Sequence, residues 1–116
     1  MLYINNNKSN KLNAKKVTFD GIRFDSKKEA LRYYELSMLQ KAGVISDLRL
    51  QVRFELTAKN DKFRASHYIA DFVYKDEEGR QTVEDVKGYR DGATYRLFKL
   101  KQKLMYDKYG IFVKEV

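Results

Sequence analysis

The order of helix-like and strand-like segments constrains the fold of this chain more than any other feature. A period of about 3.6 residues between apolar side chains predicts a helix, and alternation of apolar and polar side chains predicts a strand. In chain order the segments are a helix, three strands, a helix and a strand, over residues 26–41, 44–56, 67–74, 81–87, 94–109 and 111–116. We therefore expect an α/β fold in which a small mixed sheet is flanked by two helices.

Both predicted helices have recognisable ends and an apolar face. Ser26 and Glu29 form a capping box, while Ala42-Gly43 and Gly110 are typical of helix C-termini. Because a helix leads to the last strand, we expect that strand to run parallel to one of the three central strands. The stripe on the first helix comprises Leu31, Tyr34, Met38, Leu39 and Ala42. The face of the second helix comprises Leu97, Phe98, Leu100, Leu104, Met105 and Tyr109.

Length and composition predict one globular domain. The chain has 116 residues, of which 43% are hydrophobic and 14% are aromatic, so it can bury one core but is too short for two. Residues 1–16 are polar and rich in Asn and Lys, and we expect a flexible basic arm there, followed by a single domain over residues 17–116. Asp20-Gly21 between two apolar alternations predicts a hairpin over residues 16–24.

Residue types that are missing or rare exclude several classes of protein. The chain has no Cys, which excludes a disulfide scaffold, a thiolate zinc site and cysteine catalysis. His67 is the only His, so a site with several histidines is excluded too. No apolar run approaches the roughly 18 residues of a membrane span, and the start has no secretory signal. We expect a soluble cytoplasmic protein, with neither a membrane partner nor an organic cofactor.

The charge pattern indicates a nucleic-acid partner. Lys and Arg number 24 against 16 Asp and Glu, which gives a net charge of +8. By count, residues 1–43 have a balance of +5 and residues 88–109 one of +4, whereas residues 60–87 have a balance of −2. Basic flanks around an acidic centre suit a protein whose carboxylates hold cations while its Lys and Arg side chains contact phosphates. Part of the acidic centre is a solvated turn over residues 76–78.

The most informative residues are three polar side chains in two neighbouring strands. Asp71 interrupts an otherwise apolar strand, and Asp85 and Lys87 share one face of the next strand because they are two residues apart. A hairpin can place Asp71 beside Asp85, and two adjacent carboxylates repel unless a divalent cation lies between them. Such a cation activates water and neutralises a phosphate, while a lysine stabilises charge in the transition state. The three residues therefore suit phosphodiester hydrolysis.

Asp71, followed after thirteen residues by Asp85-Val86-Lys87, resembles the motif of the PD-(D/E)XK nuclease superfamily. The resemblance covers about residues 22–116 and extends to the αβββαβ core of restriction-endonuclease-like folds. Segments of this chain also look like a phage-borne family of small nucleases, and like the branch that holds Holliday-junction resolvases and transposon-end endonucleases. The resemblance implies that Asp71, Asp85 and the backbone carbonyl of Val86 bind Mg²⁺, for which Mn²⁺ can substitute. It also implies that Lys87 is the catalytic lysine.

Four positions leave alternatives open. Ala70 stands where the superfamily name has Pro, a position that is widely replaced. Glu84 adjoins Asp85, although the D-x-K spacing favours Asp85. Glu29 matches a third carboxylate that joins the catalytic and metal-binding set, but it lies opposite the apolar stripe of its helix. Either that opposite side faces the site, or Glu29 serves only the capping box. Gln51 matches a substrate-site Gln, and is otherwise an exposed strand residue.

DNA is the expected substrate, and two groups of cations are candidates to bind it. Lys27 and Lys28 lie at the N-terminus of the first helix, which favours anions. Arg96, Lys99 and Lys103 share one face of the second helix, which is otherwise an ordinary solvated face.

The expected function is a divalent-metal-dependent DNA endonuclease that prefers branched DNA, in the manner of a junction resolvase. Cutting two strands of a symmetric junction requires two sites, so we expect a homodimer. A sequence- or mismatch-directed nicking enzyme of the same fold, a non-catalytic DNA-binding accessory protein and an RNA-directed nuclease are the alternatives.

Overall fold

The computed structural model describes residues 2–9 and 15–116, with side chains from residue 15 onward. The helices are α1 (Lys27–Lys41) and α2 (Gly92–Tyr109). The strands are β1 (Leu2–Ser9), β2 (Lys15–Phe19), β3 (Ile22–Phe24), β4 (Ser46–Thr57), β5 (Ser66–Lys75), β6 (Gln81–Asp85) and β7 (Lys114–Glu115). From α1 onward the order is αβββαβ, as the sequence predicts.

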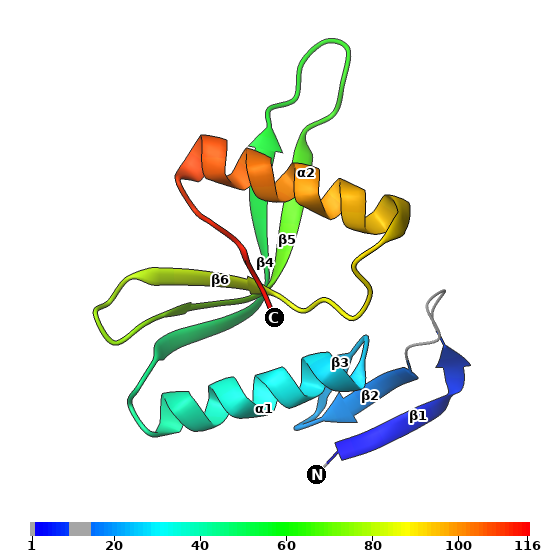
Figure 1. The fold of residues 1–116 in the computed structure, drawn as a ribbon, viewed down its shortest axis with the longest axis vertical. Coiled ribbons are helices and arrows are strands. Elements are labelled where there is room, and N and C mark those ends of the chain that lie inside the picture. Colours follow the sequence, from blue (N-terminus) through cyan, green and yellow to red (C-terminus); the bar gives the residue numbers. More distant parts are fainter. Residues whose placement is uncertain (1, 10–14) are drawn as a thin grey trace.

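The main sheet has the strand order β4-β5-β6-β7. The first three strands form an antiparallel meander, and β7 pairs in parallel with β6 after the chain returns through α2. Gly110 ends α2 in the left-handed conformation, with φ of 68°. The predicted mixed sheet and its parallel last strand are therefore confirmed (Figure 1).

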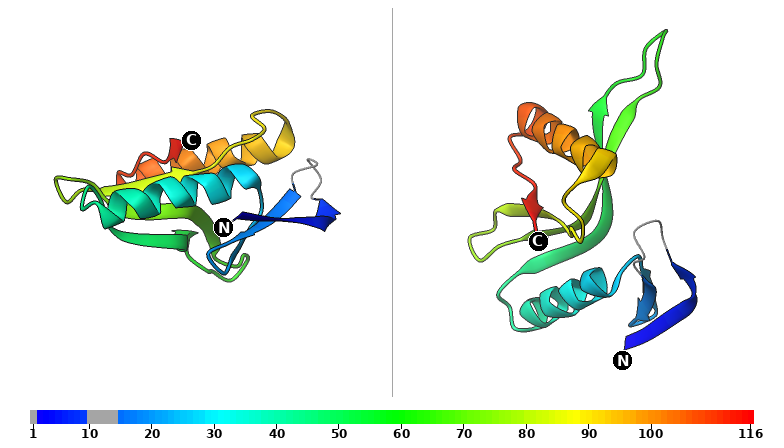
Figure 2. Two further views of the ribbon diagram at one scale, coloured as in Figure 1. Left: turned by 90° about the horizontal axis from the view of Figure 1, so that it is seen from below. Right: turned by 45° about the vertical axis from the view of Figure 1, so that its right-hand side comes forward.

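Two apolar clusters hold the helices against the sheet. Side chains of α2, β4, β5, β6 and the C-terminal segment form the first cluster. The second unites α1, β2 and β3 with the other ends of β4 and β5. The two helices consequently cover different parts of one twisted sheet, and β4 and β5 run past both of them (Figures 1 and 2).

Of the two orientations of α1 that the sequence leaves open, the structure has the one in which the apolar stripe faces away from the sheet. The apolar stripe of Leu31, Tyr34, Met38 and Leu39 faces outward, and each of these side chains is at least 36% exposed. The side that faces the sheet carries Glu29, Ala30 and Leu36, which are buried. Charged side chains on this inner side have partners in the sheet, so hydropathy alone does not show which face is buried.

The predicted inner face of α2 is only partly right. Phe98 and Met105 are buried as expected, whereas Leu97 and Leu100 are about half exposed. Gln102 is buried because its side-chain amide donates a hydrogen bond to the carbonyl of Val113 at 2.8 Å. In residues 2–9 and 15–116, no helix is long and apolar enough to cross a membrane.

A three-stranded antiparallel sheet of β1, β2 and β3 lies beside the N-terminal end of α1. Asp20 and Gly21 join β2 to β3 with φ values of 55° and 73°, which suits a tight hairpin turn and confirms that prediction. The expectation that residues 1–16 form a flexible arm is wrong for residues 2–9, which pair with β2 as β1. The rest of that prediction falls partly on residues 10–14, outside the described residues.

Candidate metal and phosphate site

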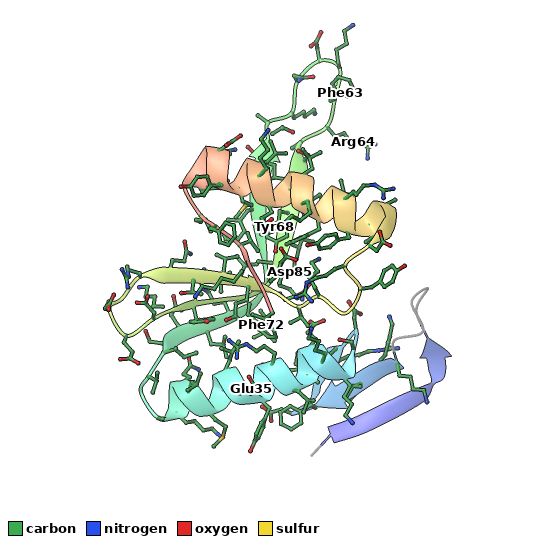
Figure 3. All side chains as sticks on the ribbon, viewed as in Figure 1. Glu35, Phe63, Arg64, Tyr68, Phe72 and Asp85 are labelled. Carbon is green, nitrogen blue, oxygen red and sulfur yellow. The ribbon has the colours of Figure 1, made fainter. Side chains whose placement is uncertain are left out.

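The candidate site lies where β5 and β6 separate. These strands pair only from Phe72 with Glu84 to Lys75 with Gln81. Asp71 and Asp85 come one residue beyond the last pair, level with each other, and Asp85 then pairs with β7 instead. Figure 3 shows Asp85 between the two helices, close to the point at which the strands diverge. The predicted juxtaposition of the two aspartates is therefore confirmed.

Asp71 is held by two donors and crowded by another carboxyl group. The backbone N–H of Val86 donates to its Oδ2 at 2.8 Å, and the side-chain amide of Gln51 donates to its Oδ1 at 3.1 Å. Burial raises the pKa of Asp71 well above its ordinary value, and the negative charge of Asp85 raises it further. A cation bound between the two carboxylates would relieve this repulsion.

Asp85 and Lys87 each contact a residue whose role in the site the sequence did not predict. The hydroxyl of Tyr68 donates to Asp85 Oδ2 at 2.6 Å, and the ammonium of Lys87 lies 3.1 Å from Asp85 Oδ1. The same ammonium is 3.7 Å from the ring centroid of the buried Phe98 in α2, a close cation–π contact. Lys87 is thus fixed beside the carboxylates instead of extending into solvent.

Glu29 reaches the site from α1, which resolves the alternative left open by the sequence. The amide of Gln51 lies 3.4 Å from Glu29 Oε1 and bridges this carboxyl to Asp71. Burial is the main cause that raises the pKa of Glu29 to about 8, followed by the negative charge of Asp71. Only half of the predicted capping box is present: the backbone N–H of Glu29 donates to Ser26 Oγ at 3.1 Å, while its side chain faces the site.

Gln51 has a left-handed backbone within a β-strand. Its φ is 51°, and it lies opposite Asp71, between the pairs of Leu50 with Phe72 and Val52 with Ala70. A side chain other than Gly in this region costs about 1–3 kcal/mol, and such residues concentrate at functional sites. The sequence shows only a polar residue at an outward position, so it does not predict this conformation.

Gln51→Gly is expected to be more stable than Gln51→Ala by about 1 kcal/mol, although Ala is normally preferred to Gly in a strand. Both variants lose the amide bridge to Glu29 and Asp71, but only Gly adopts the left-handed backbone without strain. Urea denaturation of the two variants measures the difference. An alanine variant as stable as the glycine variant would show that this backbone is not strained.

The donor set fits a hard divalent cation. Within the described ranges, no three His, Cys, Asp or Glu side chains lie close enough to form a complete metal site by themselves. Mg²⁺, however, is usually bound by one or two carboxylates and keeps several waters. Asp71 and Asp85 meet that need, and the carbonyl of Val86 is the adjacent candidate ligand. The two carboxylates repel each other, and a bound cation would reduce that repulsion.

The metal-free protein is expected to lose stability as the pH rises from about 5 to 8. The pKa of Glu29 is about 8 in the folded chain against 4.5 ordinarily, so in this range the folded state binds more protons than the unfolded state. The free energy of unfolding therefore falls with rising pH. Thermal melts in EDTA should show the loss, Mg²⁺ should reverse it, and Glu29→Gln should reduce it. A Glu29→Gln profile parallel to the wild type would contradict the expectation.

The predicted phosphate-binding cations fall into two groups. Lys27 and Lys28 are exposed at the start of α1, and the ammonium of Lys28 donates to the carbonyl of Lys87 beside the site. Arg96 and Lys103 are exposed on α2. Lys99 is also on α2, but its ammonium pairs with Glu115 at 3.0 Å. The structure thus brings Lys28 to the site and binds Lys99 to β7.

A second buried acid lies next to the site but has different partners. Glu84 is 1% exposed, and its carboxylate accepts hydrogen bonds from the guanidinium of Arg32 at 2.6 and 2.8 Å and from the hydroxyl of Tyr74. Glu84 and Asp85 therefore point to opposite sides, as strand alternation predicts. Because a buried acid needs a partner, the position of Glu84 inside an apolar strand could have been used to predict a cation such as Arg32 beside it.

The family model described as "Protein of unknown function (DUF1064)" matches residues 9–114. The chain belongs to the DUF1064 family. The match includes all four site residues of this DUF1064 protein, Glu29, Asp71, Asp85 and Lys87, together with both helices. Searches of curated proteins and of solved structures gave no match.

Proposed function

We propose that this protein is a divalent-metal-dependent endonuclease that hydrolyses phosphodiester bonds of DNA. The observation that carries the proposal is the convergence of Asp71, Asp85 and Lys87, with Glu29 beside them, where β5 and β6 separate. The likeness of Asp71 and Asp85-Val86-Lys87 to the PD-(D/E)XK motif supports it, as does the net charge of +8. We place the enzyme in the cytoplasm and expect it to act as a homodimer.

Each residue has a role that follows from its position. Asp71 and Asp85 would hold Mg²⁺ or Mn²⁺, with the carbonyl of Val86 as a further candidate ligand. The bound ion would lower the pKa of a water molecule and neutralise charge on the scissile phosphate. Lys87, beside Asp85 and over the ring of Phe98, stabilises the charge that develops on the phosphate oxygens. Gln51 holds Asp71 in place, and Glu29 is a candidate third carboxylate of the site that accepts from the same amide group.

The test is cleavage of three DNA substrates: a four-way junction, a matched linear duplex and a supercoiled plasmid. Each is incubated with Mg²⁺, Mn²⁺ or EDTA, and Asp85→Asn is the inactive control. Paired, metal-dependent cuts confined to the junction support a resolvase-like enzyme. Cleavage of all three substrates retains the nuclease and rejects the preference for branched DNA. Binding without cleavage under every condition rejects the enzyme.

A further inference from the structure

The hairpin between β4 and β5 extends beyond α2 and ends in an exposed tip of residues 58–65, hereafter the tip. Phe63 lies at its end and is 74% exposed, the highest value among the large apolar side chains of the described residues. Figure 3 shows Phe63 and Arg64 on the far side of α2 from the body of the protein. An aromatic side chain in this position contributes nothing to the core and is accessible to a partner.

The tip is built as a defined turn. The side-chain oxygen of Asn60 accepts hydrogen bonds from the N–H groups of Lys62 and Phe63, both at 2.8 Å. The N–H of Asn60 donates to the carbonyl of Phe63 at 3.0 Å. At its base, the hydroxyl groups of Thr57 and Ser66 are 2.6 Å apart, next to the last strand pair. These bonds hold Phe63 outward, so little entropy is lost when it inserts into a partner.

Charge identifies the kind of partner. Lys59, Lys62 and Arg64 flank Phe63 along the chain, and Asp61 is the single acid of the tip, which leaves a local balance of +2. All four charged side chains are exposed. DNA suits this arrangement, because its phosphates can contact the cations while the faces of its stacked bases can contact the apolar side chain.

A pocket extends from the candidate site toward the β5 end of the hairpin, although no residue of the tip lines it. It has a volume of about 280 Å³ and is lined by Asp85 and Lys87 at one end and by His67 of β5, near the base of the tip. Phe63 is eight residues from Asp71 along the chain, so at a strand rise of about 3.3 Å per residue the two lie at most about 27 Å apart. At about 3.4 Å per nucleotide, this spans no more than about eight base pairs.

We propose that Phe63 is a wedge that inserts between neighbouring bases of the DNA, within about eight base pairs of the phosphate at the metal site, while Lys59, Lys62 and Arg64 hold the backbone on either side. The proposal rests on the proposed function and adds its substrate class. A wedge favours DNA that is easily unstacked, because a mismatch, a bulge or a branch point lowers the cost of opening a base step. The protein thereby selects a deformable duplex without reading its sequence.

The first test uses duplexes that carry a one-base bulge and a 2-aminopurine at successive positions around it, with Ca²⁺ in place of Mg²⁺. Insertion unstacks the 2-aminopurine and raises its fluorescence. Phe63→Ala should abolish this rise and weaken binding to the bulged duplex about tenfold. Phe63→Leu should keep most of both, since leucine also serves as a wedge. The matched control is Phe112→Ala, which removes an aromatic side chain that is 64% exposed outside the tip.

Further outcomes separate this proposal from the proposed function. If the wild type binds DNA but Phe63→Ala gives the same fluorescence and affinity, the wedge is rejected and the nuclease is unaffected. If the wedge signal is present but Mg²⁺ never produces cleavage, the nuclease is rejected alone. If the wild type binds no DNA, both are rejected. A Phe63→Ala variant that instead changes the sedimentation coefficient, with DNA binding intact, assigns the tip to a subunit contact and overturns the wedge.

Discussion

Replacing Lys87 with alanine is expected to slow DNA cleavage about a thousandfold while the fold is retained. The Lys87 ammonium is the positive charge next to the carboxylate pair, 3.1 Å from Asp85, and its contact with Phe98 fixes its position. Without it, charge that develops on the scissile phosphate loses its stabilising partner. The measurement is the single-turnover rate with saturating protein and Mg²⁺, together with DNA affinity from fluorescence anisotropy.

Affinity should fall only severalfold in that variant, because one lost cation removes about one phosphate contact. Lys101→Ala is the matched control, since Lys101 lines the same pocket as Lys87 but makes no ion pair with Asp85. The control should lose a similar amount of affinity and keep its cleavage rate. Equal cleavage rates in the two variants would remove Lys87 from the chemistry, even if the protein proves to be a nuclease.

Replacing Arg32 with alanine is expected to destabilise the protein by about 3–5 kcal/mol, because the buried charge of Glu84 is then left with Tyr74 as its partner. Arg32 makes two hydrogen bonds to Glu84, which is 1% exposed and so cannot recover its hydration. In a domain of about this size each 1 kcal/mol lowers Tm by several degrees, so the melting point should fall by roughly 15 °C or more. Thermal melts at constant pH and salt measure the effect.

Two further variants show whether the cause is the buried charge. Glu84→Gln in the Arg32→Ala background should recover part of the loss, since a neutral amide costs less to bury than a carboxylate. Arg49→Ala removes an exposed arginine that pairs with Asp47 at 3.6 Å, and it should cost no more than about 1 kcal/mol. If Arg32→Ala lowers the melting temperature no more than Arg49→Ala does, the buried pair of Arg32 and Glu84 does not stabilise the fold.

The sequence predicts the three antiparallel strands of the main sheet and the central acids well because both follow from local periodicity. Alternation in residues 67–87 is enough to place Asp71 beside Asp85 and to put Glu84 on the other side. The same approach fails for α1, where Arg32 and Glu29 point inward to partners in the sheet and Leu31 points outward. Hydropathy treats a paired charge as a solvated one, so it selects the wrong face of this helix.

The remaining parts of the site depend on contacts that no local pattern contains. Tyr68 is on the opposite side of β5 from Asp71 by alternation, yet its hydroxyl reaches Asp85 because β5 and β6 diverge there. The sequence predicts Phe98 only as a core residue of α2, whereas in the folded chain its ring makes a cation–π contact with Lys87. The left-handed backbone of Gln51 likewise requires the strand pairing around it.

The two apolar clusters meet along β4 at Gln51, since Leu50 belongs to the cluster of α1 and Val52 to that of α2. The candidate site therefore lies where the two clusters meet on strands that they share. Proteins open locally in cooperative units, with free energies smaller than that of complete unfolding. If this chain opens first between its two clusters, Glu29 separates from Asp71 while each cluster stays packed, and amide exchange near Gln51 then reports on the intact site independently of the melting temperature.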